Sequence, residues 1–269
     1  MRRAAALDAN TPRYTIAVCK GSALLEETKA LLRAWKPAES LPEFRDRVLR
    51  EDLLGKKTAY RVNDIVRRLF APRFLVADGR PAVFLKALLR GRNGGQLFPA
   101  LCLLYAARQD ELLRDIIVEL YWPAVAEGRL ALGIRDVLMF LRQAEEDGRI
   151  PARWSEQVKL RVGRGILRAL VDFALLKEVR RGRRETVVYR PDDGAVVYLA
   201  YDLHFGGATD GAMVRHRDWA LFGLREQDVV ATMHRLGSDG WWVVQAAGSV
   251  VRITWRYESM QEVVDALAG

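Results

Sequence analysis

The segment from Arg153 to Arg190 constrains this chain more than any other. It holds eleven Lys and Arg residues against four Asp and Glu residues, a surplus of seven in a chain whose formal net charge is +9. Its first part, Ser155 to Lys177, has the apolar spacing of a helix. A basic turn, Arg180 to Arg184, and a β-prone run, Glu185 to Tyr189, follow. A helix followed by a basic hairpin is typical of a winged helix-turn-helix on DNA.

The predicted helix separates into an apolar face and a basic face when residues are placed about 100° apart. The apolar face contains Val162, Ile166, Ala169, Leu170 and Phe173. Arg161, Arg164 and Arg168 fall on the opposite side. The planar guanidinium of arginine pairs with phosphate or with a guanine edge, so we expect these three to bind DNA. The alternative is a solvated helix face.

The basic turn contains Arg180, Arg181, Arg183 and Arg184, with Gly182 between them. We expect these side chains at the tip of a hairpin, where they would contact phosphate and position the protein. No set of Asn or Gln base readers accompanies the basic cluster. Binding should therefore be largely independent of base sequence and sensitive to salt.

A second basic group, Lys56, Lys57 and Arg61, surrounds the start of another predicted helix. Thr58 is a suitable N-cap for that helix, which should end before Pro72. Free backbone N–H groups at a helix start favour phosphate, so the three residues are candidate DNA contacts. Acidic residues lie among them, and a mixed, solvated surface is equally compatible.

Composition limits the class of partner and the cellular location. A pI near 9.8 favours a polyanion, either nucleic acid or an anionic membrane surface. The longest uncharged apolar run, Asn93 to Ala107, contains Pro99 and is shorter than the roughly twenty residues that span a bilayer. The N-terminus has no apolar region of signal-peptide length. We expect a cytoplasmic protein without membrane insertion.

The helical and β-prone runs predict a mainly α fold with small β-hairpins. We expect a helical, bundle-like N-terminal domain, residues 1–150, and a winged-helix-like C-terminal domain, residues 151–269. The second domain would contain the basic wing near 178–190 and a second helix-plus-hairpin unit at 219–256. The sequence leaves open whether the helix is continuous at Gly163 and Gly165, and whether Ala195 to Leu203 is helix or strand.

No motif for catalysis is present. His204, His216 and His234 match no metal-ligand spacing, and no nucleophile elbow accompanies them. Cys19 and Cys102 lie in apolar contexts and are expected to be buried free thiols. We expect no enzymatic activity, no metal and no small-molecule cofactor.

Six segments, taken in chain order, carry a family resemblance. They are Gly21–Glu27, Asp52–Thr58, Arg114–Ile117, Trp154–Glu156, Asp218–Leu224 and Gly248–Ile253. In order and spacing they resemble the BrxA proteins of bacterial BREX phage-defence systems. The resemblance implies a mostly helical, DNA-binding accessory protein without enzymatic activity, working beside a methyltransferase, an ATPase and other BREX proteins. The very arginine-rich wing is a local departure from the family.

Double-stranded DNA and other BREX proteins are therefore the expected partners. The sequence is also compatible with two alternatives. One is an RNA-binding module, although the chain lacks the signatures of the common RNA-binding folds. The other is a protein–protein adaptor whose basic wing docks on an acidic BREX partner. Trp241, Trp242 and Trp255 would suit such an interface if exposed, but their alternation favours the core.

Overall fold

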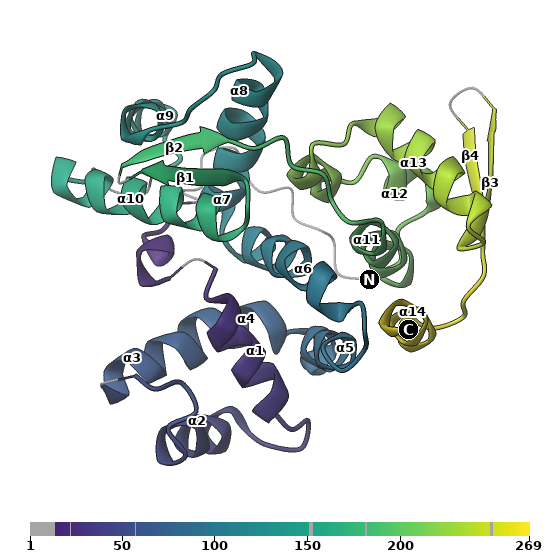
Figure 1. The fold of residues 1–269 in the computed structure, drawn as a ribbon, viewed down its shortest axis with the longest axis horizontal. Helices are drawn as coiled ribbons and strands as arrows, with labels where there is room; N and C mark the ends of the chain where they lie inside the picture. Colours follow the sequence, from purple (N-terminus) through teal and green to yellow (C-terminus); the bar gives the residue numbers. More distant parts are fainter. Residues whose placement is uncertain (1–13, 22, 57, 151–152, 181, 248–249) are drawn as a thin grey trace. The chain divides into compact units, whose positions relative to one another are not determined.

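The computed structural model describes residues 14–269 except residues 22, 57, 151, 152, 181, 248 and 249. This part is mainly α-helical with two small antiparallel hairpins, which confirms the expected fold class (Figure 1). The helical elements are η1 (Ala17–Lys20), α1 (Leu25–Ala34), α2 (Leu41–Arg50), α3 (Ala59–Asn63), η2 (Asp64–Phe70), α4 (Ala71–Phe74), η3 (Ala77–Gly79), α5 (Arg80–Leu88), α6 (Gly94–Gln109), α7 (Glu111–Asp115), η4 (Ile116–Tyr121), α8 (Trp122–Ala126), α9 (Ile134–Glu146), α10 (Glu156–Asp172), α11 (Asp193–Phe205), α12 (Asp210–Val214), η5 (Arg217–Phe222), α13 (Glu226–Ser238) and α14 (Met260–Ala268). The strands are β1 (Leu176–Arg180), β2 (Arg183–Thr186), β3 (Trp242–Ala247) and β4 (Val250–Trp255).

The chain forms two compact units, and each joins segments that are far apart in sequence. The first contains residues up to Ala23 together with Ala106–Val188, and the second contains Leu24–Tyr105 together with Tyr189–Gly269. The expected domains, residues 1–150 and 151–269, are instead two consecutive segments of the chain. Pro151, at the expected boundary, lies outside the described residues. As a statement about independently folding domains, that division stays a prediction.

The first unit places two helices and a hairpin around one apolar core. After the α7–η4–α8 run, Ala131 forms a β-bridge with Glu185 of β2. The backbone N–H of Thr186 donates to the carbonyl of Leu130 at 3.1 Å and extends this pairing. Next come α9 and α10, which pack on each other, and α10 also packs on β1 (Figure 1). The order is therefore helix, bridge, helix, helix, hairpin, with the bridge paired to the last strand.

The start of α10 follows the sequence, but its end does not. Ser155 is the N-cap, since its Oγ accepts from the backbone N–H of Val158 at 3.3 Å. The expected continuation to Lys177 is wrong, because α10 ends at Asp172 and β1 begins at Leu176. The basic turn is also shorter than expected: Arg180 belongs to β1, Arg183 opens β2, and the β run ends at Thr186 instead of Tyr189.

A left-handed alanine causes this early end. Ala174 has a φ of 61°. The backbone N–H of Leu175 donates to the carbonyl of Leu170 at 2.8 Å, which is the closure of a Schellman motif. The reversal buries Leu175 and Leu176 in the core. Glycine usually occupies the left-handed position, so an alanine there gives no signal that a sequence pattern could detect.

Tyr14 anchors the start of the described chain to the first unit. Its hydroxyl donates to Asp115 Oδ2 at 2.6 Å and accepts from Arg149 Nη1 at 2.9 Å. Arg149 also pairs with Glu119 at 2.8 Å. Burial, with the Asp115 carboxylate beside it, raises the pKa of Tyr14 far above its ordinary value, so the hydroxyl remains a donor. From this anchor η1 runs along α10.

Two helical runs continue through a proline, and in both a π-helical turn precedes it. The sequence-based end before Pro72 is wrong, because the run continues to Phe74. η2 and η4 are π-helical, and the residue before each proline donates to the carbonyl five residues back, which makes room for the ring of Pro72 or Pro123. The segments Asp64–Pro72 and Asp115–Pro123 share Asp, Ile, Leu and Pro at the same places. This shared pattern accompanies the π turn in both runs.

The second unit contains the other hairpin. The run Ala195 to Leu203, left open above, is helical and forms the buried middle of α11. β3 and β4 pair in register from Trp242 opposite Trp255 to Ala247 opposite Val250. Trp242 is buried, and the Tyr201 ring lies 5.7 Å from it and 4.8 Å from Trp255. The core position expected for Trp242 is confirmed, while Trp241 and Trp255 are half-buried.

Candidate nucleic-acid interface

The two faces expected for α10 are confirmed by burial. Val162, Ile166, Ala169, Leu170 and Phe173 are buried in the core of the first unit. Arg161, Arg164 and Arg168 are exposed. Because they are spaced by three and four residues, the three guanidinium groups project from one side of a helix whose opposite side is fixed by packing.

The three arginines differ in their local partners. Arg164 has no ion-pair partner within the described part of the chain. Arg168 lies 3.4 Å from Asp172 one turn later, and its side chain is 77% exposed, so this contact is weak and readily exchanged for phosphate. Arg161 is hydrogen-bonded to Cys19 of η1; burial raises the pKa of that thiol, and the Arg161 charge opposes the rise. All three charges therefore remain available to a ligand.

The two glycines within α10 allow it to pack closely on α9 and η1. The helix is continuous through Gly163 and Gly165, which answers the question left open by the sequence. A Cβ on Gly163 would lie 2.7 Å from Ile134 Cδ1 of α9, and one on Gly165 would lie 3.2 Å from the Val18 carbonyl of η1. α9 and η1 can therefore lie this close to α10 only because both positions are glycine. Their packing against α10 determines the side to which the arginine face points.

A buried ammonium holds the inner side of α10. Lys159 Nζ lies 2.6 Å from Glu145 of α9 and 3.3 Å from Glu156, and its side chain is 5% exposed. The hydrogen bond to Glu145 raises the pKa of Lys159, so the group stays charged. Sequence reasoning missed this residue because a lysine within a basic helix resembles its exposed neighbours.

The β1–β2 hairpin separates its arginines into two groups. Arg180 and Arg183 are paired across the turn and exposed. Arg184 is different, since its side chain is only 20% exposed and lies 3.6 Å from Glu178. Arg181 lies outside the described residues. The hairpin therefore presents Arg180 and Arg183 to solvent, whereas Arg184 is part of the hairpin's own structure.

Lys177 is a further exposed cation that the sequence did not assign to the wing. It lies on β1 opposite Glu185, two residues from the exposed Val179. The prediction of a helix to Lys177 placed it on the wrong element.

The second basic group belongs to the second unit, and its Lys56 is engaged in an ion pair there. Lys56 Nζ pairs with Glu27 at 2.6 Å. Burial alone would raise the pKa of Glu27, but the hydrogen bonds to its carboxylate and the nearby charges of Lys56 and Arg61 together outweigh burial, and the pKa is lowered. Thr58 caps α3 as expected, accepting from the backbone N–H of Arg61 at 3.2 Å. Lys57 lies outside the described residues. DNA contacts by Lys56, Lys57 and Arg61 stay predictions.

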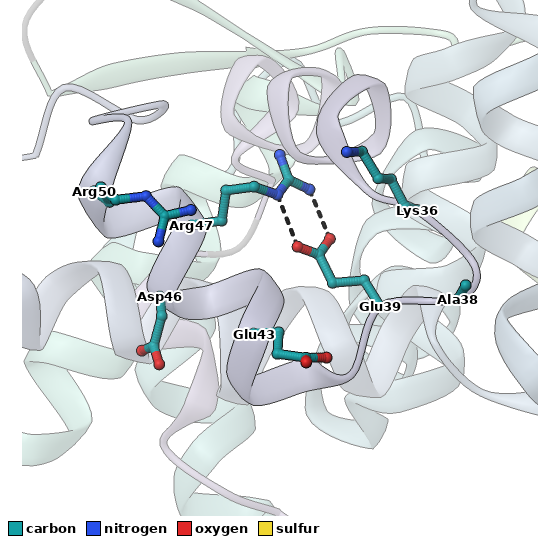
Figure 2. Close-up of a pocket in the computed structure, with 7 residues that line it drawn as sticks. All are labelled: Lys36, Ala38, Glu39, Glu43, Asp46, Arg47 and Arg50. Atoms are coloured by element: carbon teal, nitrogen blue, oxygen red, sulfur yellow. Dashed lines mark hydrogen bonds and ion pairs between the residues drawn. The ribbon is translucent and has the colours of Figure 1, made fainter.

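An open hollow on the second unit offers no free anion site. Its lining residues are Lys36, Ala38, Glu39, Glu43, Asp46, Arg47 and Arg50, on and beside α2 (Figure 2). Arg47 makes two hydrogen bonds to Glu39, at 2.7 and 2.6 Å, and this fork lowers the pKa of Glu39 (Figure 2). Three acidic groups balance three basic ones, so the hollow carries no charge surplus.

The described residues give no support for a metal centre. No group of three or more His, Cys, Asp and Glu side chains gathers there in a way that could hold an ion. His204 stacks on Trp255 with ring centres 4.3 Å apart, and burial lowers its pKa. His216 accepts from the backbone N–H of Asp218 at 3.2 Å. Cys102 is buried and Cys19 half-buried, both as free thiols.

Comparison with known proteins identifies the family. The model of the BrxA family matches residues 12–192, which include all of α10 and both strands of the basic hairpin. The chain belongs to the BrxA family. Membership associates it with BREX systems, as its sequence segments indicated. No curated protein matches the chain.

A solved structure supports the fold. The chain is similar to an uncharacterized protein from Magnetospirillum magneticum, with 19% sequence identity and a TM-score of 0.57. The similarity covers 72% of this chain and 95% of the other. At this identity the likeness concerns architecture alone. Among the described helices of this BrxA-family chain, none combines the length and apolar composition needed to cross a bilayer.

Proposed function

We propose that this BrxA-family chain is a non-enzymatic double-stranded DNA-binding component of a BREX anti-phage system, acting in the cytoplasm. The observation that carries the proposal is the outer face of α10. There Arg161, Arg164 and Arg168 are exposed on a helix whose inner side is buried. The ion pair between Lys159 and Glu145 holds that inner side against α9. A fixed row of arginines is suited to a regularly spaced polyanion.

The order of elements supports a winged helix-turn-helix mode of binding. In that mode α9 is the first helix of the turn, α10 enters the major groove, and the β1–β2 hairpin is the wing. The bridge between Ala131 and Glu185 ties the wing to the rest of the unit. Arg180 and Arg183 would then contact phosphate and fix the position of α10 in the groove.

Duplex affinity should depend steeply on salt. Five exposed arginines belong to this surface: Arg161, Arg164, Arg168, Arg180 and Arg183. With one phosphate each, the slope of log K against log salt is about −4.5. Affinity should then fall about 500-fold when salt rises from about 50 to about 200 mM.

One observation favours a second candidate, a protein adaptor that docks an acidic BREX partner. Leu130 is 79% exposed and Val188 is 70% exposed, and both flank the basic hairpin. Apolar residues beside cations suit a protein interface whose centre is apolar and whose rim is charged. An RNA-binding role has no comparable observation in its favour.

A gel-shift series with the purified full-length chain tests the proposal. The probes are a duplex of about two helical turns, one of its single strands, and an RNA duplex of the same sequence, each at low and moderate salt. The proposal expects the DNA duplex to bind most tightly, with the steep salt dependence given above. Tighter binding of RNA would favour the RNA module. Absence of nucleic-acid binding, with capture of an acidic BREX protein, would favour the adaptor.

A further inference from the structure

The arginine face of α10 contains a fourth residue at its start. Gln157, Arg161, Arg164 and Arg168 are spaced by four, three and four residues, and all four are exposed. This spacing places the Gln157 amide in line with the guanidinium groups, one turn before Arg161. A basic face counted from Arg161 leaves Gln157 out, so the arginine spacing alone predicts no base reader.

The other polar side chains in the first turn of α10 are already engaged. Ser155 Oγ accepts from Val158 N–H at 3.3 Å. Glu156 pairs with Arg142 at 3.1 Å and with Lys159 at 3.3 Å. The Gln157 amide, in contrast, has no hydrogen-bond partner within the part of the chain that the structure describes. The Gln157 amide is therefore an exposed hydrogen-bond donor and acceptor on the outer face of α10, whose inner face is buried.

We infer that Gln157 reads an adenine in the major groove; this rests on the proposed function. Its Oε1 would accept from the N6 amino group and its Nε2 would donate to N7, the two-bond pairing that glutamine makes with adenine. Residues near the start of a recognition helix lie closest to the base edges, while residues farther along reach phosphate. Binding would then be dominated by phosphate contacts but carry a preference for adenine at one position.

The second unit supplies a matched control. α10 and α13 both begin Glu-Gln, and the exposed positions of α13 have the same spacing: Gln227, Ala231, His234 and Ser238. None of the three that follow Gln227 is an arginine. Gln157 and Gln227 are thus the second residues of similarly exposed helices, and only Gln157 stands beside a row of cations. A Gln227→Ala variant removes the same amide without touching the proposed interface.

The experiment selects bound duplexes from a pool with a randomised centre, using the full-length wild type, Gln157→Ala and Gln227→Ala. The wild type should enrich adenine at one position, Gln157→Ala should lose that enrichment, and Gln227→Ala should keep it. In the selected duplex, replacing that adenine should weaken wild-type binding by about 5- to 150-fold. Replacing it with 7-deazaadenine, which keeps base pairing but lacks N7, should also weaken wild-type binding and leave Gln157→Ala unchanged.

The outcomes separate this inference from the proposed function. Salt-sensitive duplex binding without any base enrichment overturns the role of Gln157 and leaves the proposed function standing. The same adenine enrichment in Gln157→Ala also overturns it, because the reader is then elsewhere. Failure of the wild type to bind duplex DNA at all overturns the proposed function, and the inference with it.

Discussion

Replacing Glu145 by glutamine should weaken the packing of α10 on α9 and lower the stability of the fold. Glu145 is the nearer carboxylate to the buried Lys159 ammonium, at 2.6 Å, and glutamine is almost the same size. In the wild type, the backbone N–H of Trp154 donates to Glu145 Oε1 at 3.2 Å, and the glutamine oxygen can still accept this hydrogen bond. The variant loses only the negative charge opposite Lys159. The remaining partner, Glu156, is 3.3 Å away and 60% exposed, so it compensates only in part.

The expected loss of stability follows from this geometry. A hydrogen bond between charged groups contributes about 2 kcal/mol, and weakening it around a buried ammonium should cost about that amount. For a chain of 269 residues such a loss lowers the melting temperature by about 4 °C. Glu146→Gln is the matched control, because Glu146 is the exposed neighbour and has no ion pair within the described residues. It should melt within about 1 °C of wild type.

The effect should depend on pH, with a sign fixed by the pKa of Glu145. The hydrogen bond from Lys159 lowers that pKa. The carboxylate therefore stabilises the fold above its unfolded pKa of about 4.3, and this contribution is lost as pH falls through the lowered folded value. Calorimetry should show the full difference between Glu145→Gln and wild type at neutral pH and a shrinking one below about pH 4. Equal melting of Glu145→Gln and Glu146→Gln at neutral pH would show that the Glu145–Lys159 ion pair does not stabilise the fold.

Two further predictions concern the hairpin and the end of α10. Replacing Arg180 and Arg183 with alanine should change stability by less than about 0.5 kcal/mol each, and should reduce the salt slope for duplex DNA by about 1.8 in a fluorescence-anisotropy titration; an unchanged slope would exclude phosphate contact by the wing. Ala174→Gly should stabilise the protein by about 0.5–1 kcal/mol in thermal melts, because Ala174 has a φ of 61°; destabilisation would show that the left-handed alanine is not strained.

The amphipathic pattern of α10 could be predicted because its signal is local. The apolar residues of α10 recur at the helical period, and the structure buries the residues so assigned. The cap Thr58 was visible for the same reason, since a cap residue bonds within its own first turn.

The end of α10 could not be predicted, because tertiary contacts decide it. Leu176 continues the apolar pattern of the helix, whereas Leu175 would fall on the arginine face, and the burial of both depends on the reversal at Ala174. The bridge at Ala131 is a single residue and depends on Glu185, far along the chain. The π turns before Pro72 and Pro123 likewise override the local rule that a proline ends a helix.

Part of the candidate site was visible from the sequence, and part was not. The exposure of Arg161, Arg164 and Arg168 follows from periodicity. The difference between Arg183 and Arg184 does not, because it depends on which side of β2 faces the unit and on the approach of Glu178. Lys56 is similar: its pairing with Glu27 joins residues that no sequence spacing relates.

Removing the arginine face of α10 and measuring duplex binding tests directly whether this helix binds DNA. In the full-length chain, Arg161, Arg164 and Arg168 are replaced together by alanine. The control replaces Arg50, Arg215 and Arg225, three exposed arginines of the second unit, so both variants lose the same charge. Affinity for one duplex is measured by anisotropy across a salt series, and thermal melts verify that both variants fold.

We expect the α10 variant to melt like wild type and its salt slope to be shallower by about 2.7. Between about 50 and about 200 mM salt, wild type would then lose about 40-fold more affinity than the variant. The control should bind like wild type. Equal affinity and slope for the α10 variant and wild type would contradict the claim that this helix face binds DNA.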